Sequence, residues 1–491
     1  MALDDRLPVV VGTGQSIERV AAVSALDLAA AAARAALEDA SGLRHAVSRV
    51  SVVNMVSPVG PAPATALARR LGLAPTVTEV STVGGNSPPM LVARAATAIA
   101  AGEAEVVLVA GAEALRSPDA SGAPGPVEPE LDRAPDTVVG DERAGVGRHE
   151  LAAGLLAPVN IYALFESALA ARAGRTFAEH RVALGELMTP FTRVAASHPF
   201  AWFPQARHPG ELSTVSADNR LVSEPFTKRL CAVMGVNQGA ALVLTSLGAA
   251  RAAGIEAQAV FCWSSAEACD IWFPTARPDL GRAPGIAVAA AGALGASGIG
   301  IDDVDVLDLY SCFPCAVELA ADAMGIRLDD HRGLTVTGGL PYFGGPGNNY
   351  TLHAIATVVD RLRADGGVAL VTGLGWYATK HAVSIYGTEP PPSGYRVADT
   401  SAAQQAIDDD AVAVADGVVD DASGSAVVVG ATVAHGPDAA PFSAPVIARL
   451  GDGRHVAAVA EADALSSIQG RNLVGTTVRV HGTPPRYRLE G

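Results

Sequence analysis

The stretch VTGGLPYFGGPGNNYTLHAIATVV, residues 336–359, joins a glycine-rich turn to an apolar helical pattern. The turn spans residues 338–350 and contains five glycines and two prolines, a composition that lets the backbone approach a ligand closely. The helical pattern continues to about residue 364 and is followed by the apolar run VALVTG, residues 368–373. This order of turn, helix and strand predicts an α/β unit whose turn faces a ligand.

The first half of the chain repeats this order of elements. The matched strands are RVSVVNMVS (49–57) with DVDVLDLYS (303–311), EVSTVGG (79–85) with LTVTGG (334–339), and EVVLVAG (105–111) with GVALVTG (367–373). Three strands in the same order, two of them followed by a helix, indicate an internal duplication. Apolar strands that alternate with helices predict a mainly parallel sheet covered on both faces.

The remaining segments divide the chain into three expected regions. We assign residues 1–250 to the first half, with a loop insertion at about 116–235, and residues 251–388 to the second half. A long insertion of this kind usually covers a site. The linker EPPPSGY leads into alternating strands over residues 393–491, which predict a separate β domain, a small barrel for which an OB-like form is considered. Because few contacts usually cross such linkers, we expect residues 1–390 to fold alone.

Composition excludes several classes of function. The 491 residues include 35 basic and 51 acidic side chains, a formal net charge of −16, which gives no electrostatic basis for nucleic-acid binding. No clean apolar run of about 20 residues predicts a membrane span, and no secretory signal is recognised at the start. Five cysteines in so long a chain form no disulfide framework. We therefore expect a cytoplasmic protein.

Three short motifs resemble reactive or binding sites only in part. Gly12-Thr13-Gly14 lacks the third glycine of a dinucleotide-binding turn and is read as an ordinary tight turn. Cys312 and Cys315 form a Cys-x-x-Cys pair, for which redox, zinc half-site and buried structural roles are all open. The run Gly85-Asn86-Ser87 lacks the closing glycine of a hydrolase elbow, but its place before a helix favours a ligand-facing turn.

Four stretches together resemble the thiolase superfamily, in the branch of the sterol-carrier thiolase-like proteins. They are ALDLAAAAARAALEDASG (25–42), AGEAEVVLVAGAEAL (101–115), NRLVSEPFTKRLCAVMGVNQGAALVLTS (219–246) and the opening stretch 336–359. The resemblance covers roughly residues 6–388 and leaves the β domain outside. It implies a duplicated fold with α-β-α-β-α layers.

The same resemblance implies that the catalytic side chains of a thiolase are absent. The nucleophilic cysteine corresponds to Gly84, the activating histidine to Gly345 and the second cysteine to Val371. Claisen condensation or thiolysis through an acyl-enzyme needs a thiolate, a base that forms it and a second acid or base. Ordinary acyltransferase turnover of the acetyl-CoA acetyltransferase type is therefore not expected.

Three functions remain open from the sequence. The first is binding of CoA or an acyl-CoA thioester in lipid metabolism without covalent catalysis. The second is a noncovalent retro-aldolase or lyase that acts on a β-hydroxyacyl-CoA with a steroid or lipid side chain. The third is a scaffold or partner subunit that uses the β domain to bind another protein. The resemblance leaves a monomer or a dimer equally open and implies neither a metal nor a covalently bound cofactor.

The expected site residues follow from the resemblance and from the duplication. The catalytic candidates are Tyr310 and Cys312, and the expected substrate-binding residues are Gly84, Gly85, Asn86, Ser87, Phe313, Gly339, Tyr342, Gly345, Asn348 and Tyr350. We expect these loops to line one pocket that is wider than a thiolase's, because two of its catalytic side chains are replaced by glycine. Arginines of the insertion are expected to meet the CoA phosphates, since lysines are nearly absent.

Overall fold

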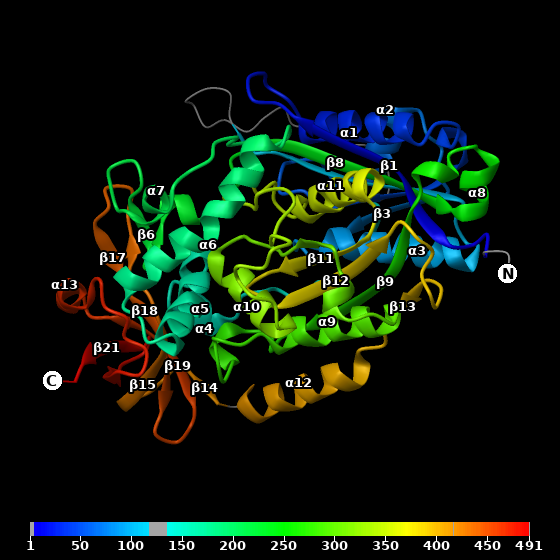
Figure 1. Cartoon of the computed structure of the whole chain (residues 1–491). Coiled ribbons are helices and arrows are strands. Elements are labelled where there is room, and N and C mark those ends of the chain that lie inside the picture. Colours follow the sequence, from blue (N-terminus) through cyan, green and yellow to red (C-terminus); the bar gives the residue numbers. More distant parts are fainter. Residues whose placement is uncertain (1–3, 117–134, 416, 491) are drawn as a thin grey trace.

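The computed structural model describes residues 4–116, 135–415 and 417–490. Both halves contribute to one hydrogen-bonded strand path with the order β10-β11-β12-β9-β1-β8-β4-β2-β3-β5 (Figure 1). The first-half strands are β1 (Pro8–Ile17), β2 (Val47–Val52), β3 (Val77–Ser81), β4 (Val106–Ala114), β5 (Thr137–Val139) and β8 (Asn237–Ser246). The second-half strands are β9 (Val260–Cys269), β10 (Val306–Asp308), β11 (Val368–Gly375) and β12 (Lys380–Gly387), with β13 (Arg396–Val397) beside β9.

The strand order of the two halves shows the predicted duplication. The order β2-β4-β8-β1 of the first half corresponds to β10-β11-β12-β9 of the second, and the two meet where β1 pairs with β9. Parallel pairs such as β2–β4 and β10–β11 form the outer part of each half. Antiparallel pairs such as β4–β8 and β11–β12 lie nearer the junction. Each half is thus a mixed sheet rather than a purely parallel one.

Helices complete the layers on both sides of the strands. α3 (Ser87–Ala101) and α11 (Tyr350–Asp365) contact strands of both halves and form the central layer. The outer helices are α1 (Ala25–Asp39), α2 (Pro63–Leu71) and α8 (Leu247–Ala252) in the first half, with α9 (Pro284–Ser297) and α10 (Pro314–Met324) in the second. α3 is buried on nearly every side because it lies between the strands of the two halves. The predicted duplicated α/β fold is confirmed.

The Gly12-Thr13-Gly14 motif lies within β1 and is not a turn. A Cβ atom on Gly12 would come within 2.1 Å of the Ala36 carbonyl oxygen, and one on Gly14 within 2.0 Å of the Ala32 carbonyl oxygen. The two glycines therefore let the alanine-rich face of α1 pack directly against the strand backbone.

The predicted strand at residues 334–339 is the clearest error in the fold prediction. This segment is irregular, and the second half lacks an equivalent of β3. The buried carboxylate of Asp308 accepts hydrogen bonds from the Val336 backbone N–H at 2.9 Å and the Thr335 hydroxyl at 3.1 Å. Because a side chain satisfies the Val336 donor, the segment can leave the ladder without an unpaired buried group there.

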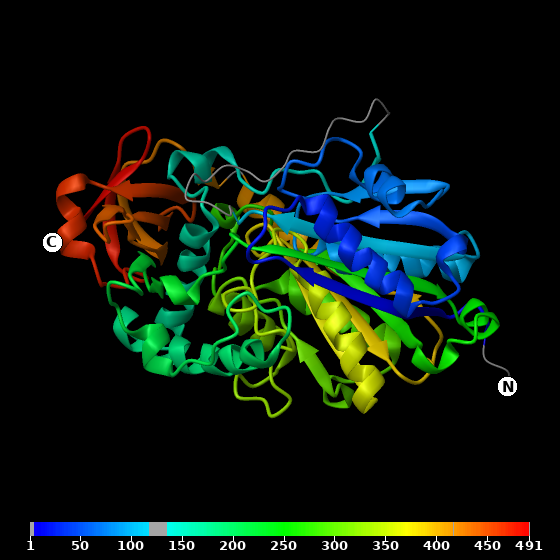
Figure 2. The same ribbon diagram turned by 90° about the horizontal axis from the view of Figure 1, so that it is seen from above.

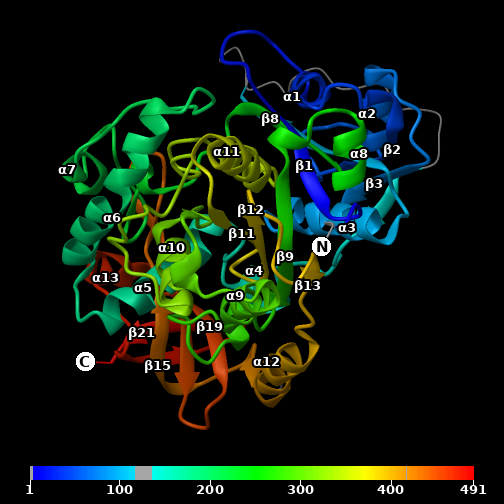
Figure 3. The same ribbon diagram turned by 45° about the vertical axis from the view of Figure 1, so that its right-hand side comes forward.

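The insertion forms a helical layer between the sheets and the C-terminal region (Figures 2 and 3). Its elements are α4 (Arg148–Ala152), α5 (Pro158–Arg172), α6 (Phe177–Ser197), α7 (Pro209–Ser213), β6 (Leu221–Ser223) and β7 (Phe226–Thr227). A capping box of Thr176 and Glu179 starts α6, as expected for this spacing. No helix of the described residues is long and apolar enough to cross a membrane.

The C-terminal region contains the predicted barrel. Five strands close in the order β19-β18-β15-β20-β21, with β21 pairing back onto β19. The strands of this region are β14 (Val418–Val419), β15 (Gly424–Ala431), β16 (Ala434–His435), β17 (Pro441–Ser443), β18 (Pro445–Leu450), β19 (His455–Ala460), β20 (Thr477–His481) and β21 (Arg486–Leu489). Two helices, α12 (Ser401–Ala415) and α13 (Leu465–Ile468), accompany them and were not predicted.

Contacts between the barrel region and the rest of the chain are extensive, so the premise that few contacts cross the linker is wrong. β16 pairs with β6 of the insertion in a four-stranded sheet. The His435 imidazole bonds to the Glu224 carboxylate at 2.9 Å, and both side chains are 1% exposed. Ile447 and Ala457 of the barrel belong to the main hydrophobic core. The barrel nevertheless has a hydrophobic core of its own, from Ala422 to Tyr487, so the boundary and the independent folding of residues 1–390 stay predictions.

We predict that His435→Gln weakens the protein more at pH 6 than at pH 8.5. Burial lowers the pKa of His435. The hydrogen bonds to the Glu224 carboxylate and the Ala439 carbonyl raise this pKa by more than burial lowers it, so the net shift is upward. The stabilisation from the raised pKa is fully present below the unfolded value of about 6.5 and is lost as pH rises through the folded pKa. Urea unfolding should show a loss of about 1–3 kcal/mol at pH 6 that shrinks at pH 8.5.

The exposed His331 gives the matched control, because its side chain is 91% exposed. His331→Gln should change the unfolding free energy by less than about 0.5 kcal/mol at both values of pH. A loss for His435→Gln that stays constant or grows with pH would contradict a charged His435–Glu224 pair.

Candidate functional site

The glycine-rich loop of the second half meets the turn before α3. Asn348 accepts a hydrogen bond from the Gly84 backbone N–H at 2.9 Å and donates to the Asn54 carbonyl at 2.8 Å. The Thr351 hydroxyl donates to the Gly85 carbonyl oxygen at 2.7 Å. The loops that the duplication places in equivalent positions are therefore brought side by side at the centre of the molecule.

Tyr310 lies directly against this turn. A Cβ atom on Gly85 would sit 2.4 Å from the Tyr310 hydroxyl oxygen, and one on Gly373 would sit 2.8 Å from the Gly85 carbonyl oxygen. The Tyr310 backbone N–H donates to the Thr372 hydroxyl at 2.8 Å, which fixes Tyr310 to the end of β11. Burial raises the pKa of Tyr310 well above its usual value, so its phenol stays protonated at neutral pH.

A buried lysine packs against the turn at the centre of the junction. The Lys380 ammonium donates to the Val83 carbonyl oxygen at 2.5 Å, and the lysine is 3% exposed. Burial lowers the pKa of Lys380, against the opposing effect of Asp141. The expected pocket lined by all three loops stays a prediction; the glycine-rich loop lines a cavity, described below, through Pro341 and Tyr342. Lys380 was not predicted, although it is one of only two lysines and follows the turn after β11.

The side chains of Ser87 and Asn86, at the start of α3, are buried against neighbouring residues. The Ser87 hydroxyl donates to the Thr82 carbonyl oxygen at 2.7 Å and is fully buried, so it is positioned as a local cap and not as a nucleophile. Asn86 is the N-cap residue of α3, and its buried Oδ1 has no hydrogen-bond partner among the described residues. The turn therefore presents one unsatisfied amide oxygen beside Gly84.

Cys312 and Phe313 also lie in packed surroundings. The Phe313 ring stacks between Tyr162, at a centroid distance of 4.7 Å, and Phe226, at 5.4 Å. Burial raises the pKa of the Cys312 thiol to about 12. Because only the thiolate is a good nucleophile, Cys312 is poorly suited to covalent catalysis at neutral pH.

Tyr350 belongs to a buried hydrogen-bond network beneath Tyr310. Its hydroxyl lies 2.6 Å from the Thr337 hydroxyl and 3.4 Å from a carboxylate oxygen of Asp308. Burial raises the pKa of Asp308 to about 7. The rings of Tyr310 and Tyr350 meet edge to face at 5.6 Å, so the network supports the Tyr310 ring from below.

An open cavity of about 490 Å³ lies beside the other end of the glycine-rich loop. Its lining residues are Arg116, Trp202, Phe203, Arg207, Asp218, Lys228, Arg229, Val233, Gly235, Pro341 and Tyr342. A Cβ atom on Gly345 would lie 3.4 Å from the carbonyl oxygen of Val233, a lining residue, so the cavity adjoins the position that the resemblance assigns to the activating histidine. Gly339 lies on the inner side of the same loop, against Ser311.

The charge of this cavity is strongly positive. Four basic side chains face one acidic side chain, that of Asp218. Arg116 and Lys228 are exposed, and neither forms an ion pair with any residue in the described part of the chain. Arg207, by contrast, pairs with Glu211 at 3.3 Å. The basic residues come from the insertion, and their expected contacts with phosphates stay a prediction. The aromatic pair Trp202 and Phe203 was not predicted.

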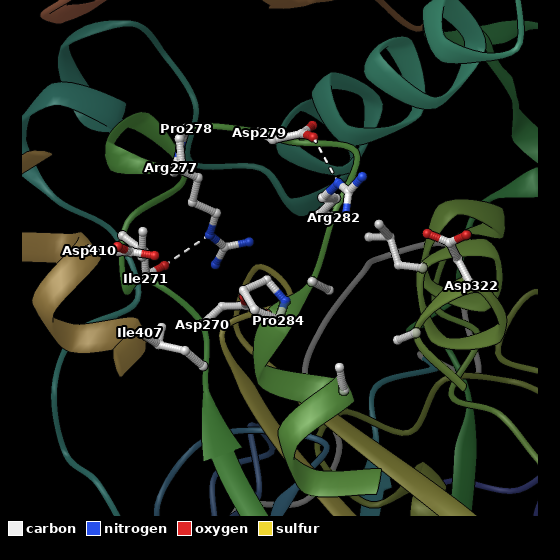
Figure 4. Close-up of a pocket in the computed structure, with 14 residues that line it drawn as sticks. Asp270, Ile271, Arg277, Pro278, Asp279, Arg282, Pro284, Asp322, Ile407 and Asp410 are labelled. Atoms are coloured by element: carbon white, nitrogen blue, oxygen red, sulfur yellow. Dashed lines mark hydrogen bonds and ion pairs between the residues drawn. The ribbon is translucent and has the colours of Figure 1, made fainter. Parts of the chain in front are cut away.

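A second cavity, of about 390 Å³, has the opposite charge (Figure 4). Arg277 points toward it, with Nε donating to the Ile271 carbonyl oxygen at 2.8 Å. Four aspartates and two arginines are among its lining residues, which are Asp270, Ile271, Arg277, Pro278, Asp279, Arg282, Ala283, Pro284, Ala287, Leu319, Asp322, Ala323, Ile407 and Asp410. This excess of acid is unsuited to a polyphosphate ligand.

Comparisons with known proteins agree on the fold. The profile of the family described as "Thiolase, N-terminal domain" matches residues 9–125. The crystal structure of a monomeric SCP2-thiolase like protein type 1 from Mycobacterium smegmatis is 33% identical, with a TM-score of 0.84, and the match covers 99% of this chain and 100% of that one. No curated protein sequence matches the chain.

Two more distant structures share the fold alone. One is an Ltp2-ChsH2(DUF35) aldolase, 21% identical with a TM-score of 0.61, and the match covers 78% of this chain and 98% of that one. The other is the dimeric peroxisomal thiolase of Saccharomyces cerevisiae, 14% identical with a TM-score of 0.59, over 79% of this chain and 99% of that one.

We predict that Gly84→Cys yields no thiolysis of acetoacetyl-CoA. Gly84 has a φ of +144°, and a Cβ atom there would lie 2.3 Å from Oδ1 of Asn86 and 3.1 Å from Cε of Lys380. The substitution should lower the unfolding free energy by about 1–3 kcal/mol. A spectrophotometric thiolysis assay with urea unfolding measures both effects. Activity above the wild-type background would contradict the assignment of position 84 and of the missing base.

Proposed function

Because the chain belongs to the family of SCP2-thiolase-like proteins, we propose that it binds CoA or an acyl-CoA thioester without forming an acyl-enzyme. The observation that carries this proposal is the positive cavity beside Gly345 and Tyr342. A thiolase fold presents its reacting carbon near the positions that Gly84 and Gly345 occupy here, so a ligand in this cavity would reach toward that centre.

The lining chemistry matches the parts of a CoA thioester. CoA carries a pyrophosphate and a further phosphate, which Arg116 and Lys228 can bind because these side chains are exposed and unpaired among the described residues. The rings of Trp202 and Phe203 offer faces for an adenine or for the apolar pantetheine arm. A positive entrance also accelerates the arrival of an anionic ligand.

The absence of covalent chemistry follows from the groups at the junction. Gly84 supplies no nucleophile, and Gly345 supplies no base. The thiol of Cys312 stays protonated in its apolar surroundings, as its raised pKa indicates. An acyl group therefore has no accessible thiolate to which it could transfer among these residues.

A noncovalent lyase is the second candidate, and Tyr342 favours it. The Tyr342 hydroxyl is buried at the cavity wall and has no hydrogen-bond partner among the described residues. Burial raises the pKa of Tyr342 above its usual value, so the phenol remains a proton donor. It could donate to the thioester carbonyl of a β-hydroxyacyl-CoA, where negative charge develops during retro-aldol cleavage.

The scaffold alternative has less support than ligand binding. The barrel strand β15 packs against α5 of the same chain, where the Ala431 backbone N–H donates to the Ser167 hydroxyl at 3.0 Å. This face of the barrel is therefore occupied within the chain. A partner protein would have to use another face of the C-terminal region.

We predict that removal of the two unpaired basic side chains weakens CoA binding. Arg116→Ala and Lys228→Ala should each raise the Kd of acetyl-CoA by about tenfold, because a charge-assisted contact contributes about 1.5–3 kcal/mol. Isothermal titration calorimetry gives the Kd, and a steeper salt dependence is expected for the wild type than for either variant. Arg34→Ala, which removes an exposed arginine on α1, serves as the matched control and should leave the Kd unchanged.

If Arg116→Ala and Lys228→Ala bind acetyl-CoA as tightly as the wild type and the Arg34→Ala control do, the assignment of this cavity is contradicted. Wild-type protein that is folded but takes up no CoA thioester at millimolar concentration would also contradict it.

Tyr342→Phe separates the two candidate functions. For a binding protein, loss of one hydroxyl should raise the Kd of a β-hydroxyacyl-CoA by about three- to tenfold, with no carbonyl product from either protein. For a lyase, the wild type should release an aldehyde or ketone, and the variant should lose about 100-fold or more in kcat at little cost in KM. Mass spectrometry of the products decides between the two functions. If the wild type releases an aldehyde or ketone, the protein is a lyase and the proposal of binding without turnover is wrong.

A further inference from the structure

Three metal-ligating side chains converge where α5, α6 and α10 meet, away from the positive cavity. They are Glu166 of α5, His180 of α6 and Glu318 of α10, and one potential ligand atom of each lies within 4.8 Å of the others. The His180 Nε2 atom and the Glu166 Oε1 atom are 2.6 Å apart. Two helices of the insertion and one helix of the second half are thus joined through polar groups inside an otherwise apolar contact.

This cluster leaves several buried polar atoms without protein partners. Glu166 is fully buried and His180 is 1% exposed. Oε2 of Glu166, Nδ1 of His180 and Oε2 of Glu318 have no hydrogen-bond partner within the described residues. Each unsatisfied buried group costs about 1–3 kcal/mol, so an ion that engages the two carboxylate oxygens would offset their share of this penalty, whereas Nδ1 of His180 faces away from the Nε2 side of the cluster.

The two carboxyl groups of the cluster lie close enough to share a proton, and a metal ion would take the place of that proton. Two carboxyl groups share a desolvated site, and burial raises the pKa of Glu166 to about 7 and that of Glu318 well above its usual value. Arg175 is the nearby positive charge and acts on Glu318 and His180. It does not pair with either carboxylate in the described structure, because neither appears within ion-pair distance of it.

We propose that Glu166, His180 and Glu318 bind a divalent first-row transition metal ion, with Zn²⁺ as the best match. Carboxylate oxygen and imidazole nitrogen are ligands that Zn²⁺ accepts at about 2.0–2.2 Å, and the set lacks the soft thiolates that copper(I) prefers. A span of 4.8 Å or less closes around such an ion by small side-chain movements. The metal replaces the proton between His180 and Glu166.

A cavity of about 330 Å³ gives the ion a path from solvent. Glu318 is among its lining residues, together with the acidic Glu186 and Asp329 and the basic Arg175. Three protein ligands leave at least one coordination position for water or for a small anion from this side. The metal would act as a clamp that ties α5 and α6 of the insertion to α10. This role is independent of the proposed CoA binding.

The test uses the full chain after treatment with a chelator, and Zn²⁺ alone as the probe. Calorimetry should show one equivalent bound by the wild type. Free Zn²⁺ at 100 times its Kd should raise the folding equilibrium constant about 100-fold, measured by urea unfolding. Co²⁺ should give a visible absorption band at the same stoichiometry.

The same change, glutamate to glutamine, at a proposed ligand and at a nearby non-ligand position distinguishes this site from adventitious metal binding. Glu318→Gln resembles a protonated carboxyl group in shape and should fold, but it should bind Zn²⁺ at least 100-fold more weakly and lose the Co²⁺ band. Glu186→Gln, which removes an exposed carboxylate of the same cavity, should behave like the wild type. If Glu318→Gln does not fold, Glu318→Asp serves instead and should shift the Co²⁺ band.

Two results would overturn the proposal. One is a folded wild type that binds no stoichiometric Zn²⁺ or Co²⁺. The other is a Glu318 variant that keeps wild-type affinity, since the bound metal would then lie elsewhere on the chain.

Discussion

The close approach of glycine backbones at the centre of the molecule is the constraint on which the site depends. Cβ atoms on Gly373 and Gly375 would lie 2.8 Å from the Gly85 carbonyl oxygen and 3.1 Å from the Gly84 Cα. No other residue fits such contacts without backbone movement. The turn before α3 and the end of β11 can meet only because these positions lack side chains, and the Asn348 amide then holds the two halves together.

This packing determines the shape of the candidate site. Beside Gly84, which the resemblance assigns to the nucleophile, the Lys380 ammonium donates to the Val83 carbonyl oxygen and the Tyr310 ring lies against Gly85. The open space lies instead beside Gly345, where the insertion supplies basic and aromatic side chains. The proposed binding of a CoA thioester without covalent catalysis rests on this combination of a packed turn and an adjoining positive cavity.

The sequence predicted the repeated elements well because periodicity and glycine spacing are local signals. It failed where long-range contacts decide the outcome. The Val336 backbone N–H donates to the Asp308 carboxylate, so the segment 334–339 forms no strand although its sequence pattern is that of a strand. The buried pair His435–Glu224 joins segments more than 200 residues apart, which no linker composition reveals. Gly84, Tyr310 and Asn348 could be placed together from the duplication, but their close packing and the partner Lys380 could not.

The most direct measurement is a crystal structure of the protein soaked with acetoacetyl-CoA. The account predicts phosphates against Arg116 and Lys228, with an intact thioester directed toward Gly345 and no bond to any side chain. An acyl group attached to Cys312 or to another residue, or CoA bound at the acidic cavity around Arg277, would contradict it.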